Sequence, residues 1–565
     1  MKKIISFGLL LAMLFSAVSC GLVTDVEVES SESVSEIEDN DPSEGTPDGE
    51  ESESDENDDM NSELNMENFI KNATVYKAGS VYALVNGERV ATFDQAEPPI
   101  SVEGKIYFSS DFLLDNMDIF ADPSQKIEKD GISYSSAEVF TDYDYFLFTD
   151  ETYEIAVIST ESFTFEDENA KKEFAKFAVN YFALGDGNVS ALFKSDRPVL
   201  FTTDEMLEAA KAQATDQNDP LYNTMSDILK KADAALVKGP APDTGKSAQA
   251  YRLAACIDMI NAHYLAIAFN YTEDEKYLQG AVDFLLAYAG PMLGTDRYLD
   301  YSKPTTDGQA DIGLNIAAPL TTACEVYALI YRNVSDNDKK TIERWIGNEA
   351  KLIVKGHEYW IAKEYYDEQY GNNHLSSHLM GIVAAALVLQ DQDLLDYALL
   401  PEENAACLPT MIGHAILMEG DEVWHGDTDS DFRNGEIYDR YRVVSTPSNG
   451  FGYSMYHLKF LTHISMMLYN NGVDYFSYFG DNGENMKLSF LVYADYLIAN
   501  DSTLHGGHYS GNSLNRQNAY STYTIANFVY HDDGIAEVLQ AFEDQHIQCE
   551  EAELFGISTL YLFGK

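Results

Sequence analysis

Apolar residues recur with the 3.6-residue period of an α-helix over most of residues 190–560. The clearest stripe consists of Tyr277, Leu278, Ala281, Val282, Leu285 and Ala289. The same period predicts helices over 248–269, 272–289, 311–332, 335–354, 375–391, 402–418, 453–470 and 485–499. Short polar turns separate them, which favours antiparallel hairpins in one mainly helical domain at 190–560. Because no fixed repeat is visible, an incomplete α/α toroid is favoured over a regular α-solenoid.

The two ends of the second of these predicted helices carry recognisable signals. Thr272 and Glu275 have the spacing of a capping box, which marks a helix N-terminus. Gly290-Pro291 follows the apolar stripe and predicts the end of the helix.

A different period, with short alternating apolar runs between turns, predicts a small β-rich domain at 74–160. The clearest hairpin has Asn86-Gly87 at its turn, with the first strand ending at Val85 and the return strand at Arg89 to Phe93. Residues 85–117 resemble the copper amine oxidase N-terminal-like domain, with a VNG hairpin, a Pro-Ile pair, a second glycine turn and a short helix. Despite that name, the resemblance implies a non-catalytic module, and the segment shows no copper ligands.

The first twenty residues are typical of a secretory signal. Lys2 and Lys3 precede an apolar run at 4–18, which is too short to span a bilayer as a mature helix. Cys20 follows in a pattern that resembles a bacterial lipobox and implies lipidation at this cysteine. Ala17 replaces the usual leucine, so plain secretion is the alternative. We expect residues 1–20 to be a lipoprotein signal peptide and the protein to be anchored on the extracellular face of the membrane.

Charge is very unevenly distributed along the chain. Residues 21–67 contain nineteen Asp and Glu residues and no Lys or Arg. This composition predicts a disordered acidic linker at 21–65. The whole 565-residue chain has 36 Lys plus Arg against 94 Asp plus Glu, for a net charge of -58. This excess of acidic residues excludes nucleic acid as a binding partner and makes an anionic membrane surface a poor one. An anionic substrate would therefore need a few local cationic or hydrogen-bonding groups.

The cysteines offer no metal site. Cys256, Cys324, Cys407 and Cys549 are widely spaced, mostly within apolar patterns, and read as small buried hydrophobes. There is no CxxC or Cys/His cluster to suggest zinc.

The segment Gly371-Asn372-Asn373-His374 is the most informative for chemistry, because it enters an apolar helix directly. A helix N-terminus presents unpaired N–H groups and partial positive charge. Amide and imidazole donors placed there can therefore bind a carboxylate. An ordinary N-cap requires only one Asn, which is the plainer interpretation of the pair. His378 follows His374 at i, i+4, but the Glu of a zinc motif is absent, and we expect His378 to be packed.

Asn372-Asn373-His374 resembles the signature of the alginate lyase type of polysaccharide lyase, which is built on an α/α toroid. Two further segments agree with this resemblance. They are residues 313–317 leading to 325–327, and residues 449–457, which end in Tyr456-His457. It implies β-elimination on a uronate polysaccharide such as alginate or glucuronan, without an organic cofactor. Asn373 and His374 would neutralise the substrate carboxylate, and Tyr456 would act as base, acid or both.

One position departs from the family pattern. Where well-known alginate lyases have an arginine seven residues before the catalytic tyrosine, this chain has Asn449. We expect Arg442 to take this catalytic role, with Arg440, Arg433 or a second histidine as alternatives.

A polar segment at 424–436 is long enough to be a functional loop. Trp424 is suited to stacking on a sugar, and His425 and Arg433 to contacting a carboxylate. Asp427, Asp429 and Asp431 alternate like calcium ligands but lack EF-hand spacing, and a solvated acidic loop is an equal alternative. The predicted substrate-binding residues are Asn372, Trp424, His425, Arg433, Arg440, His457 and Gln309.

Two other functions remain open at the level of sequence. A toroid glycoside hydrolase would need two carboxylates flanking a sugar, with candidates Asp427, Asp429, Asp431 and Glu436. A non-catalytic glycan-binding lipoprotein is the other, favoured by the acidic tether and the 37 tyrosines. For the favoured function we expect a monomer that takes an anionic uronate polysaccharide and has no metal.

Overall fold

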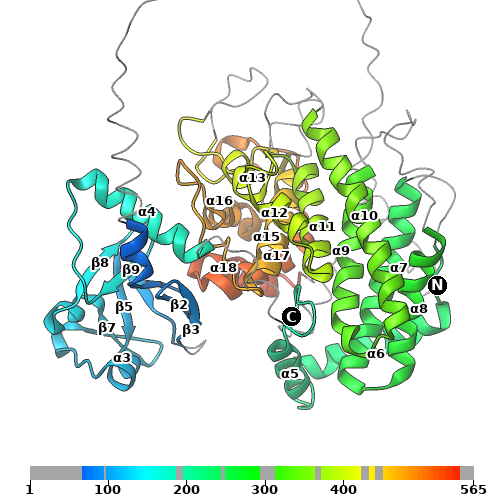
Figure 1. Cartoon of the computed structure of the whole chain (residues 1–565), viewed down its shortest axis with the longest axis horizontal. Helices are drawn as coiled ribbons and strands as arrows, with labels where there is room; N and C mark the ends of the chain where they lie inside the picture. Colours follow the sequence, from blue (N-terminus) through cyan, green and yellow to red (C-terminus); the bar gives the residue numbers. More distant parts are fainter. Residues whose placement is uncertain are drawn as a thin grey trace, which may run out of the picture. The chain divides into compact units, whose positions relative to one another are not determined.

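The structure, a computed structural model, describes residues 66–93, 97–185, 195–242, 248–292, 312–362, 371–421, 432–439 and 450–547. Its larger part is helical, as predicted, and a β-rich region precedes it (Figure 1). The helices of the larger part are α5 (Asp204–Gln213), α6 (Pro220–Lys238), α7 (Ala248–Thr272), α8 (Glu275–Met292), α9 (Ile312–Ile330), α10 (Asp336–Ala362), α11 (Asn373–Leu389), α12 (Gln392–Leu399), α13 (Leu408–Ala415), α15 (Gly450–Tyr469), α16 (Met486–Ala499), α17 (Arg516–Tyr530) and α18 (Asp533–Asp544).

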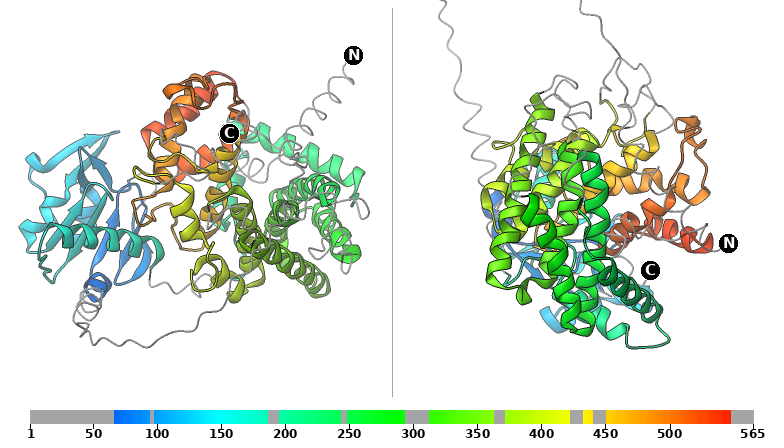
Figure 2. Two further views of the ribbon diagram at one scale, coloured as in Figure 1. Left: turned by 90° about the horizontal axis from the view of Figure 1, so that it is seen from above. Right: turned by 90° about the vertical axis from the view of Figure 1, so that its right-hand side faces the viewer.

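The β-rich region contains two antiparallel sheets. The first has the order β3-β2-β1-β9-β8, formed by β1 (Thr74–Lys77), β2 (Tyr82–Val85), β3 (Glu88–Ala91), β8 (Phe146–Asp150) and β9 (Ile155–Ser159). The second has the order β4-β5-β7-β6, formed by β4 (Ile100–Val102), β5 (Lys105–Ser109), β6 (Lys126–Lys129) and β7 (Ile132–Ser136). The helix α3 (Ser110–Met117) packs on β5 and β7, and α4 (Glu168–Leu184) packs on β1 and β9 (Figure 2).

The predicted hairpin is confirmed. Tyr82–Val85 pairs with Glu88–Ala91, and the turn residues Asn86 and Gly87 both have positive φ, at 50° and 77°. Two consecutive positive φ angles match the right-handed twist of the flanking strands, and Asn-Gly adopts them at low cost.

The helices of the larger part form two layers. Along the inner layer, α7 packs on α9, α9 on α11, α11 on α15 and α15 on α17, while α6, α8, α10 and α12 pack outside. In α11 nearly every residue is buried, whereas α10 buries one face only, as expected of inner and outer helices. This alternation of inner and outer helices is that of an α/α toroid.

Neighbouring inner helices run in the same direction. Near the C-termini of α7 and α9, the Asn270 side-chain amide donates to the Leu329 carbonyl at 3.1 Å. Near the start of α9, Gly313 lies against His378 of α11, and Ala317 lies against Gly381 one turn further along both helices. The N-termini of these inner helices therefore lie at one end of the layer, where their partial positive charges add.

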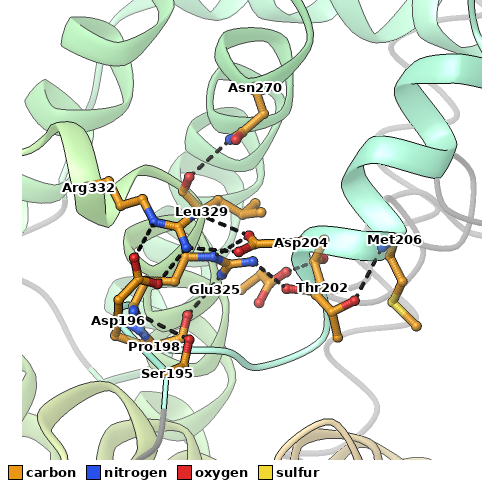
Figure 3. A network of polar contacts seen from close by, with 12 residues as sticks. Ser195, Asp196, Pro198, Thr202, Asp204, Met206, Asn270, Glu325, Leu329 and Arg332 are labelled. Carbon is orange, nitrogen blue, oxygen red and sulfur yellow. Dashed lines mark hydrogen bonds and ion pairs between the residues drawn. The ribbon is translucent and has the colours of Figure 1, made fainter. Parts of the chain in front are cut away.

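A polar network holds the segment before α5 against the C-terminal end of α9 (Figure 3). Arg332 lies between Asp196 and Asp204, donating to them at 2.6 and 2.8 Å. These bonds to the Arg332 guanidinium hold the pKa of both carboxyls below the usual range. Nearby, the buried Glu325 carboxylate accepts from the Thr202 hydroxyl at 2.6 Å and from the Phe201 N–H at 3.1 Å.

Several predicted helix ends were wrong. Thr272 belongs to the last turn of α7, where its hydroxyl donates to the Ala268 carbonyl, and the Asp274 side chain accepts from the Lys276 N–H at the start of α8. Asp274 immediately precedes the helix, so its carboxylate reaches that first-turn N–H. Helix α8 also continues through Gly290-Pro291 to Met292.

The helix predicted over 402–418 is only Leu408–Ala415, because Ile416 leaves it to pair with Ile437. The cysteines Cys324 and Cys407 are buried free thiols, as predicted, and Cys256 is a half-buried one. Two helical segments in the described residues, Ala250–Thr272 and Gly313–Asn333, are apolar and long enough to cross a membrane, but 61% and 94% of their apolar windows are buried inside the protein.

Candidate active site

The first turn of α11 carries the predicted Asn-Asn-His segment. Asn372 is its N-cap, and the Asn372 side-chain oxygen accepts from the His374 and Leu375 N–H groups at 3.1 and 3.2 Å. The plainer interpretation therefore applies to Asn372, whose side chain stabilises the helix start. Asn373 and His374 follow as buried polar side chains at the positive end of the helix dipole. The His374 ring stacks on Trp360 of α10, with centroids 4.2 Å apart, which fixes its plane.

The approach to α11 is held by very close backbone packing. A Cβ at Gly371 would lie 2.5 Å from the His414 carbonyl carbon and 2.6 Å from the Ala415 nitrogen, at the end of α13. Only a glycine allows the two backbones to approach so closely. The Ala415 carbonyl in turn accepts from the Tyr438 N–H at 2.8 Å, which links the start of α11 to residues 435–438.

Asp439, two residues after Ile437, contacts α15. The Asp439 carboxylate lies 2.6 Å from Nδ1 of His457, and both side chains are fully buried. One helical turn earlier, the Ser454 hydroxyl bonds to the Ile437 carbonyl at 3.4 Å. His457 therefore holds α15 against residues 437–439.

Tyr456 lies on a different face of α15 and is half-buried. Its ring stacks with Phe460, with centroids 6.4 Å apart, and its phenolic oxygen accepts from the Asn518 side-chain amide of α17 at 3.5 Å. Asn518 was not predicted from the sequence, because it stands in no motif and a lone Asn in a polar segment gives no signal. The structure thus connects the start of α11, residues 435–439, the first half of α15 and the start of α17.

Arg433 has a structural role. Its guanidinium donates to the Val492 carbonyl at 2.6 Å, pairs with Glu436 at 3.3 Å and lies over the Tyr496 ring of α16. Glu436 is fully buried, whereas the Arg433 side chain is 31% exposed. The other predicted positions Gln309, Trp424, His425, Arg440, Arg442 and Cys20 lie outside the described residues, as do Asp427, Asp429 and Asp431.

His378, one turn after His374, is a packed core residue as predicted. Its ring lies 5.8 Å from that of His357, whose Nε2 is 3.2 Å from the Asn404 side-chain nitrogen. Burial lowers the pKa of His378 well below its ordinary value and that of His357 to about 3, so both are neutral. Among the described residues no group of three or more His, Cys, Asp or Glu side chains is placed to hold a metal. His263 and His463 are also buried, whereas His414 is exposed.

Two cavities lie away from these residues. One, of about 280 Å³, is lined by Asp204, Lys211, Asn270 and Arg332 near the C-terminal ends of α7 and α9. The other, of about 230 Å³, is lined by Lys77 and Glu154 of the β-rich region and by Lys487 and Tyr530. Lys487 pairs with Glu154 at 3.3 Å and with Asp532 at 3.1 Å. The charge of Lys487 beside this cavity is therefore already paired within the protein. The candidate site is therefore the region that joins the start of α11, the first half of α15 and the start of α17, which holds the predicted residues Asn373, His374 and Tyr456.

Comparison with known protein families decides the class of the larger domain. Residues 202–503, more than half of the chain, match the alginate lyase family. The chain belongs to the alginate lyase family. It is therefore a polysaccharide lyase, and the predicted family resemblance is confirmed for the helical domain. The matched range includes Asn373, His374 and Tyr456 but ends before Asn518.

Solved structures that resemble this alginate lyase family member include three crystal structures. An alginate lyase from Bacteroides ovatus is 14% identical, covers 64% of this chain and 98% of its own, and has a TM-score of 0.44. Alginate lyase A1-III from Sphingomonas species A1 is 12% identical, with coverages of 58% and 88% and a TM-score of 0.40. A variant of A1-III complexed with a tetrasaccharide is 13% identical, with coverages of 57% and 84% and a TM-score of 0.40. Comparison with curated proteins finds no match.

Proposed function

We propose that this lyase cleaves a uronate-containing polysaccharide of the alginate or glucuronan type by β-elimination. The observation that carries the proposal is the link between the Asn373-His374 turn and Tyr456. Gly371 packs on the end of α13, the Ala415 carbonyl bonds to residue 438, and Asp439 holds the helix of Tyr456. The packing of α11 on α15 supports the proposal, because the groups proposed to bind the carboxylate and the proposed acid–base group then lie on adjoining inner helices.

The chemistry requires both kinds of group. The proton on C5 lies next to the uronate carboxylate and becomes acidic only when the negative charge of that carboxylate is offset. Asn373 and His374, at the positive end of α11, are suited to bind the carboxylate, and Trp360 holds the His374 ring in place.

In the elimination step the C5 proton passes to Tyr456 and its electron pair forms the C4–C5 double bond. The C4–O bond breaks, and the leaving oxygen takes a proton from the same tyrosine or from water. Tyr456 is half-buried, unlike its neighbour His457, and so remains open to a substrate. For the charge that would stabilise its phenolate we propose Arg442, with Arg440 as the alternative, since Arg433 is engaged by Glu436 and Val492.

A glycoside hydrolase on the same fold is disfavoured. Of its candidate carboxylates in the described residues, Glu436 is fully buried and paired with Arg433. An acid in that position cannot reach a glycosidic oxygen.

The test is the ultraviolet absorbance of the unsaturated uronate that elimination leaves, measured with the full chain on a panel of uronate polysaccharides. Removing an acid–base group typically costs 10²–10⁴-fold, so Tyr456→Phe should lose about that factor and Asn373→Ala a comparable one. Tyr453→Phe, one turn earlier on α15 and also half-buried, is the matched control and should retain activity. New reducing ends without absorbance would refute elimination, and glycan binding without turnover would favour the non-catalytic alternative.

We also propose that the protein is anchored by a lipid on Cys20 at the outer face of the membrane. The support is the signal-like segment at residues 1–20. Labelling with a radioactive fatty acid should mark the wild type, and Cys20→Ala should lose the label and appear in the medium. An unlabelled wild type found in the medium would instead show plain secretion.

A further inference from the structure

The phenolic oxygen of Tyr456 accepts a hydrogen bond from the side-chain amide of Asn518 on α17, at 3.5 Å. Hydrogen bonds between catalytic groups are often long before substrate binds and shorten in the reacting complex. A tyrosine that takes a proton must pass through its phenolate form, and its unperturbed pKa of about 10 makes that form rare at neutral pH. A donor aimed at this oxygen favours the phenolate.

The position of Asn518 is set by a segment that is fastened to α15. The Asn512 side-chain oxygen accepts from the Phe451 N–H at 3.0 Å, satisfying a donor at the start of α15. Tyr509 is fully buried, and its hydroxyl lies 3.2 Å from that of Tyr493. Because the chain is held at both points, Asn518 reaches Tyr456 from a fixed backbone.

One further observation indicates that the Asn518 side chain has more than a structural role. The side-chain oxygen of Asn518 is buried and has no hydrogen-bond partner among the described residues. A buried amide oxygen without a partner is costly in a purely structural setting.

We propose that Asn518 is a further catalytic residue, whose amide N–H donates to the Tyr456 oxygen and stabilises the phenolate during proton transfer. It supplies part of the stabilisation that the family arginine, replaced here by Asn449, would give. The proposal rests on the function proposed above. Neither Asn518 nor any residue of α17 falls within the family match, so this contact belongs to the tertiary structure of this chain.

Steady-state kinetics of Asn518→Ala across pH test the role. Hydrogen bonds to charged groups are the strong ones, so kcat/KM at neutral pH should fall about 10- to 100-fold. The acidic limb of the pH profile, where Tyr456 loses its proton, should move up by about one to two pH units, because the phenolate has lost its donor. Gln517→Ala, the exposed neighbour on the same helix turn, is the matched control and should change neither quantity.

A fluorinated tyrosine at position 456 separates catalysis from folding, because its phenol ionises at lower pH without a donor. It should restore much of the activity of Asn518→Ala and return the limb toward its original position. Asn518→Asp keeps the size and the acceptor but replaces the donor with a negative charge, and should be slower than Asn518→Ala.

An active wild type with Asn518→Ala equal to Gln517→Ala would overturn the inference and leave the proposed function standing. If Asn518→Ala lost activity without moving the acidic limb of the pH profile, and the fluorinated tyrosine did not restore the activity, the role of Asn518 would be structural. That result would also overturn the inference. A wild type inactive on every uronate polysaccharide would refute the proposed function, and this inference with it.

Discussion

Replacing Gly371 by alanine should disable the candidate site while leaving the rest of the fold intact. The added Cβ would lie 2.5–2.6 Å from backbone atoms of His414 and Ala415, at least 0.8 Å closer than ordinary contact at 3.4 Å or more. Because the obstacle is backbone, the start of α11 must move by roughly that distance, at a cost typical of overpacking, about 1–3 kcal/mol. Asn373 and His374 move with it, and a misplacement of about 1 Å can cost about 100-fold in rate.

The rate of unsaturated product formation and the thermal unfolding midpoint measure the two effects. Gly413→Ala on neighbouring α13 is the matched control, because in the described part of the chain, apart from its chain neighbours and its own helix backbone, nothing lies within 4 Å of the added Cβ. In a helix this change should stabilise the protein by up to about 1 kcal/mol and leave the rate unchanged. If Gly371→Ala kept the wild-type rate and stability, the packing between the start of α11 and the end of α13 could not be what positions the site.

Three further changes test the interior. Burial raises the pKa of Glu349 to about 7 from an unfolded value of 4.5, so the stability it contributes is full below about pH 4.5 and lost as pH rises through about 7. Glu349→Gln should therefore raise the free energy of unfolding by about 3 kcal/mol near pH 8.5 and change it little near pH 4.5, and a pH-independent effect in urea titrations would contradict this. Asp439→Asn removes the carboxylate from a fully buried 2.6 Å contact with His457 and should lower the free energy of unfolding in urea by about 1.5–3 kcal/mol. A loss of less than about 0.5 kcal/mol would show that the contact contributes little to stability. Glu325→Ala removes the carboxylate that accepts from the Thr202 hydroxyl and the Phe201 N–H, and should cost about 2–4 kcal/mol in the same assay, while a neutral result would mean that water replaces the carboxylate.

Local signals in the sequence were reliable where the neighbouring backbone alone sets the outcome. The Asn86-Gly87 turn formed because both residues tolerate positive φ, and Asn372 capped α11 because its side chain reaches N–H groups two and three residues on. They failed where two signals compete over a few residues. Asp274 supplied the cap bond at the start of α8 although Thr272 has capping-box spacing, and Ile416 left its predicted helix to pair with Ile437.

The sequence by itself determined the helical and β-rich parts and the family motifs, because periodicity, turn residues and short motifs are properties of adjacent positions. It also placed Asn373, His374 and Tyr456 among the candidate residues. Only the tertiary structure decided that Arg433 is held by Glu436 and Val492, that Asp439 meets His457, and that Asn518 reaches Tyr456. These contacts join residues on separate elements, and they depend on how the inner helices and their entering segments pack, which no local pattern encodes.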